Sequence, residues 1–117
     1  MQNDPFIPLR GDIWAVDFNP VRGHEQGGRR PCLIVSVDPF NRSRAALVIG
    51  LPLTTVERQI NSHVSVMSPE GGVRRPSFVM CEQIRVLSRE RLDQRWGHVS
   101  PQTMQAVEAQ LRRIQGL

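Results

Sequence analysis

Several residue types are missing or scarce in this 117-residue chain, and each absence narrows what the protein can be. Tyrosine is absent, and cysteine occurs only at Cys32 and Cys81. Two cysteines so far apart, each inside an apolar run, indicate neither a metal site nor a disulfide framework, so we expect small buried side chains in strands. The longest largely apolar stretch, residues 45–53, is interrupted by a glycine and a proline and falls well short of the roughly 20 residues that cross a bilayer.

The first ten residues, MQNDPFIPLR, contain an aspartate and two prolines and lack an apolar centre. This composition is not typical of a secretory signal. The length suits one domain, so we expect a single domain over residues 1–117, located in the cytoplasm and making no contact with a membrane.

Lysine is absent as well, so all 15 basic residues are arginines, and the formal net charge is +4. Guanidinium groups offer a planar fork of donors that suits phosphate and stacks on bases, which is compatible with a polyanionic partner. A composition bias that replaces lysine by arginine throughout would leave the same pattern. The charge therefore indicates nucleic acid only weakly.

Short apolar segments separated by Gly, Pro, Asn and Asp predict a mainly β protein. In residues 11–18, Trp14, Val16 and Phe18 alternate onto one face. Residues 38–44 read as a polar turn and residues 88–92 as one helical turn. The expected strands are residues 11–18, 32–37, 45–53, 63–67, 77–81, 83–87 and 96–99.

The C-terminal segment changes its period, because apolar residues recur there at helical spacing. Ser100 is a fitting N-cap, Pro101 suits the first turn, and Gly116 follows the last apolar position. No alternation of strands and helices appears, so we expect a small curled β-barrel with this helix closing one end. The apolar positions of the helix are Met104, Val107, Leu111 and Ile114.

The most unusual segment is the loop GHEQGGRRP at residues 23–31. It groups an imidazole, a carboxylate, an amide and two guanidinium groups around paired glycines, which let a backbone approach a ligand closely. One interpretation is an anion-binding or phosphate-reacting loop, and the other is a mobile hairpin with solvated charges. His24 and Glu25 have no second ligand pair at usable spacing, so we expect no metal and no other cofactor. Two of the three histidines could form an acid–base pair, but His63 and His98 sit at apolar strands, where most histidines are structural.

Further motifs surround this loop in an ordered way. Residues 11–31 read GDIWAVDFNPVRGHEQGGRRP, residues 52–55 read PLTT, and Ser77 precedes the run EQIR at residues 82–85. Together these motifs resemble the MazF/PemK family of toxins from toxin–antitoxin modules. The long first motif is specific, the Thr and Glu-Gln motifs are weak alone, and the resemblance covers nearly the whole chain.

The resemblance implies an SH3-like barrel of the MazF/Kid/CcdB type, a homodimer and a metal-independent endoribonuclease. Such an enzyme cleaves single-stranded mRNA at short sequence motifs through the 2′-hydroxyl of the RNA and thereby arrests translation. It leaves a 2′,3′-cyclic phosphate and a 5′-hydroxyl. The resemblance also implies a small acidic antitoxin, similar to MazE, as partner.

Residue by residue, the resemblance implies that Arg30 and Thr54 are catalytic. Arginine normally stays protonated, so we expect Arg30 to act electrostatically, with Glu25 as proton acceptor. Strand alternation lets only one of Thr54 and Thr55 face the site, and the sequence does not decide which. Some relatives carry Arg-x-Asp where this chain has Met80-Cys81-Glu82, so their acid–base set does not transfer. The expected RNA-binding residues are Gln26, Arg29, Thr55, Ser77, Glu82 and Gln83, with Arg29 supplying only diffuse attraction.

Two other functions stay open. A non-hydrolytic toxin of the same fold inhibits DNA gyrase, and a relative without catalysis would bind RNA and leave it intact. Fold alone does not separate these functions. The loop at residues 23–31 together with Arg30 and Thr54 favours the nuclease.

Overall fold

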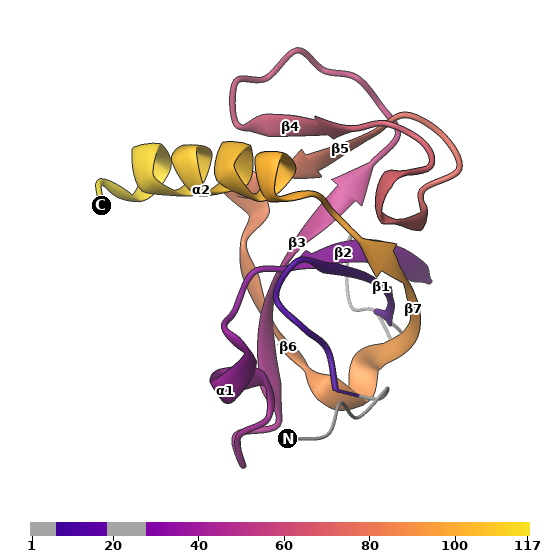
Figure 1. Ribbon diagram of the computed structural model, residues 1–117, viewed down its shortest axis with the longest axis vertical. Helices are drawn as coiled ribbons and strands as arrows, with labels where there is room; N and C mark the ends of the chain where they lie inside the picture. Colours follow the sequence, from indigo (N-terminus) through magenta and orange to yellow (C-terminus); the bar gives the residue numbers. More distant parts are fainter. Residues whose placement is uncertain (1–6, 19–27) are drawn as a thin grey trace.

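The computed structural model describes residues 7–18 and 28–117, and its strands all pair antiparallel with their neighbours (Figure 1). Along the sheet the strand order is β4-β5-β3-β2-β1-β7, and β6 pairs separately with β3. The strands are β1 (Asp12–Asp17), β2 (Arg29–Ile34), β3 (Leu47–Thr54), β4 (His63–Val66), β5 (Ser77–Met80), β6 (Arg85–Ser88) and β7 (Leu92–His98).

Strand β3 is the centre of the architecture because it has different partners along its length. Residues 47–50 pair with β6, residues 50–52 with β2, and residues 53–54 with β5. This exchange of partners bends the sheet sharply, although the described strands do not close into a continuous hydrogen-bonded ring. The expected fold class, a mainly β barrel-like sheet with a C-terminal helix, is confirmed.

Strands β1 and β2 are buried on both faces over most of their length, so the alternation along them divides their apolar residues between two cores. Ile13 of β1 and Leu33 of β2 belong to the core beneath the C-terminal helix. Trp14 and Val16 belong to the second core, inside the curl of the sheet, and Phe18 packs against it. The expected shared face of these three side chains is thus observed.

Helix α2 (Pro101–Gln115) covers the first core and lies alongside β4 (Figure 1). Val107 is fully buried, and Met104 and Leu111 pack against the same cluster. The Ser100 side chain accepts a hydrogen bond from the Thr103 amide at 3.1 Å, and Gly116 ends the helix in the left-handed conformation. The expected caps are therefore both present.

A buried carboxylate fixes the start of β1. Asp12 has no exposed surface, and it accepts hydrogen bonds from the Leu9 amide at 2.9 Å and the Trp14 indole at 3.2 Å. Arg95 and His98 each lie 3.0 Å from its Oδ1. The preceding Gly11 is required because a Cβ there would lie 2.8 Å from the His98 ring. Gly11 and Asp12 thus have a structural role, because they hold the start of β1 against β7.

Two local expectations need correction, and a third is confirmed. Residues 38–44, expected as a polar turn, contain the short helix α1 (Asp38–Asn41), with Pro39 in its first turn. The side-chain amide of Asn41 stabilises this helix by donating hydrogen bonds to the carbonyls of Pro8 and Ser36. The last strand, expected at residues 96–99, extends over Leu92–His98 because β1 supplies backbone partners to its polar first half. The helical turn expected at residues 88–92 is a 3₁₀ turn at Arg89–Arg91.

Among the described residues, no helix is long and apolar enough to span a membrane.

Candidate functional site

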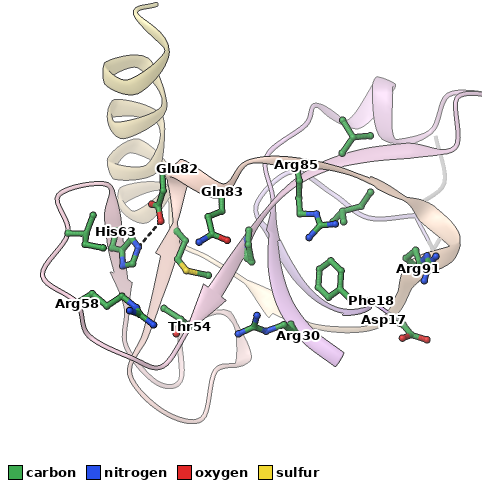
Figure 2. A pocket seen from close by; sticks show the side chains of 15 residues that line it. Asp17, Phe18, Arg30, Thr54, Arg58, His63, Glu82, Gln83, Arg85 and Arg91 are labelled. Atoms are coloured by element: carbon green, nitrogen blue, oxygen red, sulfur yellow. Dashed lines mark hydrogen bonds and ion pairs between the residues drawn. The ribbon is translucent and has the colours of Figure 1, made fainter. Parts of the chain in front are cut away.

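A groove of about 760 Å³ opens where the ends of β1, β2 and β3 meet the segment from β5 to β6 (Figure 2). Four arginines and two carboxylates line it, so the groove carries a net positive charge. Residues far apart in the sequence meet there because β3 is bonded to both β2 and β5. Its labelled residues in Figure 2 are Asp17, Phe18, Arg30, Thr54, Arg58, His63, Glu82, Gln83, Arg85 and Arg91.

Arg30 projects into the centre of the groove from β2 (Figure 2). Its guanidinium forms no hydrogen bond or ion pair with any residue that the structure describes. The adjacent Arg29 lies outside the groove, is exposed, and forms an ion pair of 2.8 Å with Asp93 of β7. Strand alternation therefore leaves one guanidinium available to an anion in the groove and engages the other at the surface.

Thr54 lies beside Arg30 on the same side of the groove, at the end of β3 (Figure 2). Its Oγ1 accepts a hydrogen bond from the Val56 amide at 3.1 Å, which leaves the hydroxyl proton as a donor. Thr55 does not line the groove. The alternative that the sequence left open is thus resolved geometrically, with Thr54 facing the groove.

Glu82 lies at the end of the groove next to β4 and is held by two donors. The Ser62 hydroxyl donates to Oε1 at 2.6 Å, and the His63 Nε2 lies 3.0 Å from Oε2. Burial acts to raise the pKa of Glu82, but the hydrogen bonds from Ser62 and His63 outweigh it and keep the pKa below its ordinary value. Glu82 is therefore a fixed carboxylate acceptor at neutral pH.

His63 was expected to be structural, yet it lines this groove beside Glu82. Its side chain is only 4% exposed, and its Nδ1 has no hydrogen-bond partner among the described residues. Because the ionised carboxylate only accepts, Nε2 carries the proton that bonds to it. No local motif marks His63, since only the pairing of β4 with β5 brings it to Glu82.

Arg85 and Phe18 form the opposite side of the groove (Figure 2). The Arg85 guanidinium lies 4.6 Å from the centroid of the Phe18 ring, within the range of a cation–π contact. The Phe18 amide in turn donates to the Gly28 carbonyl at 3.1 Å. The sequence analysis assigned neither residue to a site, because their spacing in the chain does not reveal this contact.

The remaining predicted residues divide into three groups. Gln83 lines the groove beside Glu82, as the resemblance implied. Glu25 and Gln26 lie outside the described residues. Thr55 and Ser77 lie away from the groove in a second cleft, which is lined by Pro31, Thr55, Arg74, Arg75, Ser77 and Trp96 among others.

Neither cysteine is placed as a nucleophile. Burial raises the pKa of Cys32 to about 12 and that of Cys81 to about 11, and both thiols are buried and free. Cys32 lies in β2 as expected, and Cys81 directly follows β5. The described residues contain no group of three His, Cys, Asp or Glu side chains that could hold a metal ion.

Comparison with known proteins identifies the family to which this chain is similar. The sequence pattern of the family described as "PemK-like, MazF-like toxin of type II toxin-antitoxin system" matches residues 9–115. The chain belongs to this toxin family. The resemblance that the loop motifs indicated is thereby confirmed.

Individual relatives of this MazF-like toxin agree. It is 34% identical over 107 residues to a Bacillus subtilis (strain 168) protein named Endoribonuclease EndoA, with 91% of this chain and 92% of that one covered. MazF from Deinococcus radiodurans has a TM-score of 0.80 at 26% identity, covering 95% of this chain and 98% of that one. An endoribonuclease from a mycobacterial species, solved in complex with its cognate antitoxin, has a TM-score of 0.76 at 28% identity, covering 95% of each chain.

Proposed function

We propose that this MazF-like toxin is a sequence-specific endoribonuclease that cleaves single-stranded mRNA and thereby arrests translation. The observation that carries the proposal is the basic groove that is lined both by Arg30, free of described partners, and by Thr54, whose hydroxyl proton is left to donate. The named endoribonuclease activities of its relatives support the same reaction class.

In the proposed reaction, the 2′-oxygen of the RNA attacks the adjacent phosphorus while the bond from phosphorus to the 5′-oxygen breaks. The 2′-hydroxyl loses its proton to a base, and the leaving 5′-oxygen gains one. The products are a 2′,3′-cyclic phosphate and a free 5′-hydroxyl. Since the nucleophile belongs to the RNA, the proposed reaction needs no metal-bound hydroxide.

In this proposal Arg30 and Thr54 stabilise the negative charge of the phosphorane that forms at the reacting phosphate. A guanidinium fork and a hydroxyl donor aimed at phosphate oxygens stabilise charge that develops in the transition state. Arginine stays protonated, so proton transfer needs another group, and we assign the acceptor role to Glu25. We assign the reading of base edges beside the reacting phosphate to the Glu82 carboxylate and the Gln83 amide. We propose the same base-reading role for the Gln26 amide.

The positive charge of the groove also indicates which partners this toxin binds. A small acidic antitoxin similar to MazE would be attracted to the arginine-lined groove and would compete there with RNA. The relative from a mycobacterial species was solved with its cognate antitoxin, which supports this assignment. We further propose a homodimer, as the family resemblance implies.

The test is incubation of the purified toxin with a long single-stranded RNA in EDTA. We expect cleavage at a short motif, with cyclic phosphate and 5′-hydroxyl ends, and no cleavage of an RNA with 2′-deoxyribose at the cut site. RNA that stays intact under all conditions would overturn the enzyme assignment.

Arg30→Ala and Arg29→Ala form the matched pair of variants. Loss of one well-placed donor to transition-state charge costs about a hundredfold to a thousandfold in rate, which we expect for Arg30→Ala. Arg30→Lys should restore activity only in part, because a point charge lacks the forked donors. Arg29 is exposed and paired with Asp93, so Arg29→Ala should weaken binding only slightly. Single-turnover cleavage measures all three, and an inactive Arg29→Ala beside an active Arg30→Ala would reverse the assignment.

A further inference from the structure

Trp96 of β7 is a large aromatic side chain held at the surface. It is 40% exposed, whereas Trp14, the other tryptophan of the chain, is 5% exposed. In the pairing of β1 with β7, Ile13 is opposite Gly97 and the next residue, Trp14, is opposite Arg95. Trp96 therefore has no partner in β1 and is the extra residue of a β-bulge. A bulge redirects a side chain out of the regular alternation, and here it belongs to the strand that flanks the second cleft.

Close contact between backbones fixes Trp96 in this position. A Cβ on Gly72 would lie 2.3 Å from the Trp96 carbonyl oxygen, and one on Gly97 would lie 2.8 Å from the Gly71 carbonyl carbon. Only glycines allow the turn Glu70–Gly72 and β7 to approach so closely. The indole is therefore presented by rigid backbone rather than by a loose loop.

The second cleft, of about 540 Å³, combines this indole with positive charge. Arg74 and Arg75 are exposed and form no ion pair with any residue in the described part of the chain. Arg75 lies 3.4 Å from the Thr55 hydroxyl, and Arg95 is bound to the buried Asp12. None of the described residues that line the cleft is acidic.

The cleft and the groove are neighbours that lie on different sides of two chain segments. Arg30 and Thr54 line the groove, whereas their neighbours Pro31 and Thr55 line the cleft. Successive Cα atoms are about 3.8 Å apart, so a strand leaving the groove reaches the cleft by crossing one edge of the sheet. A single occupant can therefore contact both sites.

We propose that the second cleft binds the single-stranded RNA that flanks the reacting phosphate, with one base stacked on Trp96 and phosphates held by Arg74 and Arg75. This inference rests on the proposed function. Basic grooves with exposed aromatic side chains bind single strands without reading sequence, because every base offers a flat face. The cleft thus supplies affinity for long RNA, and the groove selects the cleavage motif.

The lining favours RNA over a peptide. An acidic peptide would satisfy the arginines, but it would need apolar pockets for its anchoring side chains. Among the described lining residues, Trp96 is the only exposed large apolar side chain, and Val73 is 3% exposed. A flat exposed indole in a cleft that three arginines also line suits a base and its phosphate better.

Tryptophan fluorescence tests the proposal directly, because Trp14 is buried and Trp96 is exposed. The probes are 2′-O-methyl oligonucleotides of mixed sequence, which lack the attacking hydroxyl and cannot be cleaved by the proposed reaction. An oligonucleotide of about 12 nucleotides spans groove and cleft, whereas one of about 4 fills a single site. We expect the longer one to quench the emission and to bind Trp96→Leu roughly ten- to a hundredfold more weakly.

Arg74→Ala and Arg75→Ala give a second, independent measurement. Each should lower the slope of log Kd against log salt by about 0.7, as expected for one lost contact to a phosphate of a single strand. Arg112→Ala, an exposed arginine in the last turn of α2, is the matched control and should leave the slope unchanged. Trp96→Leu should also cleave a long RNA with a raised KM and an unchanged kcat.

The outcomes separate the two proposals. If the toxin cleaves RNA but the longer oligonucleotide neither quenches Trp96 nor distinguishes the variants, the cleft assignment is wrong and the proposed function stands. Quenching by poly-glutamate but not by the oligonucleotide would assign the cleft to an acidic peptide. If acrylamide fails to quench the Trp96 fluorescence of the free toxin, the cleft is assigned to an interface between two copies of the chain. This result and quenching by poly-glutamate alone would each overturn the RNA proposal.

Discussion

At two places in the chain, neighbouring residues of one type face different surroundings. Arg30 and Thr54 line the groove, whereas Arg29 pairs with Asp93 and Thr55 lines the second cleft. The motifs favoured Arg30 over Arg29, but they could not show which of Thr54 and Thr55 faces the groove. That choice depends on the register of β2 and β3, which is a property of the folded sheet.

Thr54→Val and Thr55→Val therefore form a matched pair. Thr54→Val removes a hydroxyl aimed into the groove, and we expect cleavage to slow by about a hundredfold, while Thr55→Val should change it only a few-fold. The Thr54 hydroxyl also accepts from the Val56 amide, so thermal unfolding should show a loss of about 1 kcal/mol in Thr54→Val. Thr54→Ser keeps the hydroxyl and should retain most activity. Equal losses in the two valine variants would contradict the placement of Thr54 at the reacting phosphate.

The groove also contains residues that the sequence motifs did not assign to a site. These residues are His63, Arg85 and Phe18, which come from separate strands or strand ends. The folded sheet brings His63 to Glu82 and Arg85 to Phe18. Single-sequence reasoning locates residues that form a contiguous motif, such as the loop before β2. It does not locate residues that approach one another only through pairing over a long sequence separation.

At the scale of elements, the sequence predicted well wherever one physical signal dominated. Six of the seven strands overlap apolar segments with turn residues on both sides, and the helical period together with its caps placed α2. The strand β7 was placed too short because its first half, Leu92-Asp93-Gln94-Arg95, is polar. Its pairing comes from β1 rather than from burial of its own side chains. Helix α1 was missed because a buried hydrogen-bond network around Asn41 holds it.

Helix α2 is attached to the rest of the fold by a carboxylate at its N-terminus. Glu70 accepts from the Ser100 amide at 2.8 Å and from the Thr103 hydroxyl at 2.6 Å. Although burial acts to raise it, these hydrogen bonds hold the pKa of Glu70 below its ordinary value of 4.5. A lowered pKa means that the folded state favours the charged form. The resulting stabilisation is fully present above pH 4.5 and is lost as the pH falls through the lower value of the folded state.

We therefore expect Glu70→Gln to lower the free energy of unfolding by about 1 kcal/mol at pH 7, because a neutral amide accepts less strongly and adds no charge at the helix N-terminus. The difference from wild type should shrink below pH 4.5 and vanish once Glu70 is protonated in the folded protein. Chemical denaturation at several pH values measures this. Glu90→Gln, at an exposed position in the turn Arg89–Arg91, is the control. A difference that stays constant from pH 7 to pH 3 would contradict the role assigned to Glu70.

At the scale of the whole molecule, positive charge is concentrated in two neighbouring hollows, the groove and the second cleft. Four arginines line the groove, and three more line the second cleft, against two carboxylates in all. Composition revealed the excess of arginine, but not where it gathers. Neither hollow is visible in the sequence, because each is built from segments that only the curled sheet brings together (Figures 1 and 2).

This distribution leads to a prediction about the proposed antitoxin. Expressed from its native operon, the toxin should co-purify with a short acidic chain, and that chain should suppress cleavage of RNA. Because exposed charges are screened by salt, raising the ionic strength should weaken both the inhibition and the binding of RNA. Size-exclusion chromatography with light scattering measures the complex, and the free toxin should have twice the mass of the chain. Cleavage that is unaffected by co-expression would contradict a shared binding surface.

The paired residues at the ends of β2 and β3 have a consequence for insertions and deletions. Both faces of β2 are apolar, since Cys32 and Ile34 pack in one core and Leu33 in the other, so its register is weakly specified by hydrophobicity. Insertion of one codon before β2, if it shifts the strand by one place, would move Arg29 into the place of Arg30 and keep a guanidinium in the groove. In β3 a slip in the opposite direction would bring Thr55 to the place of Thr54. It would also put Leu51 in the place of Gly50, where a Cβ would lie 3.0 Å from Leu87 Cδ1, and this opposes the slip. Of the two strands, β2 should therefore tolerate changes in length during the divergence of such toxins, and β3 should resist them.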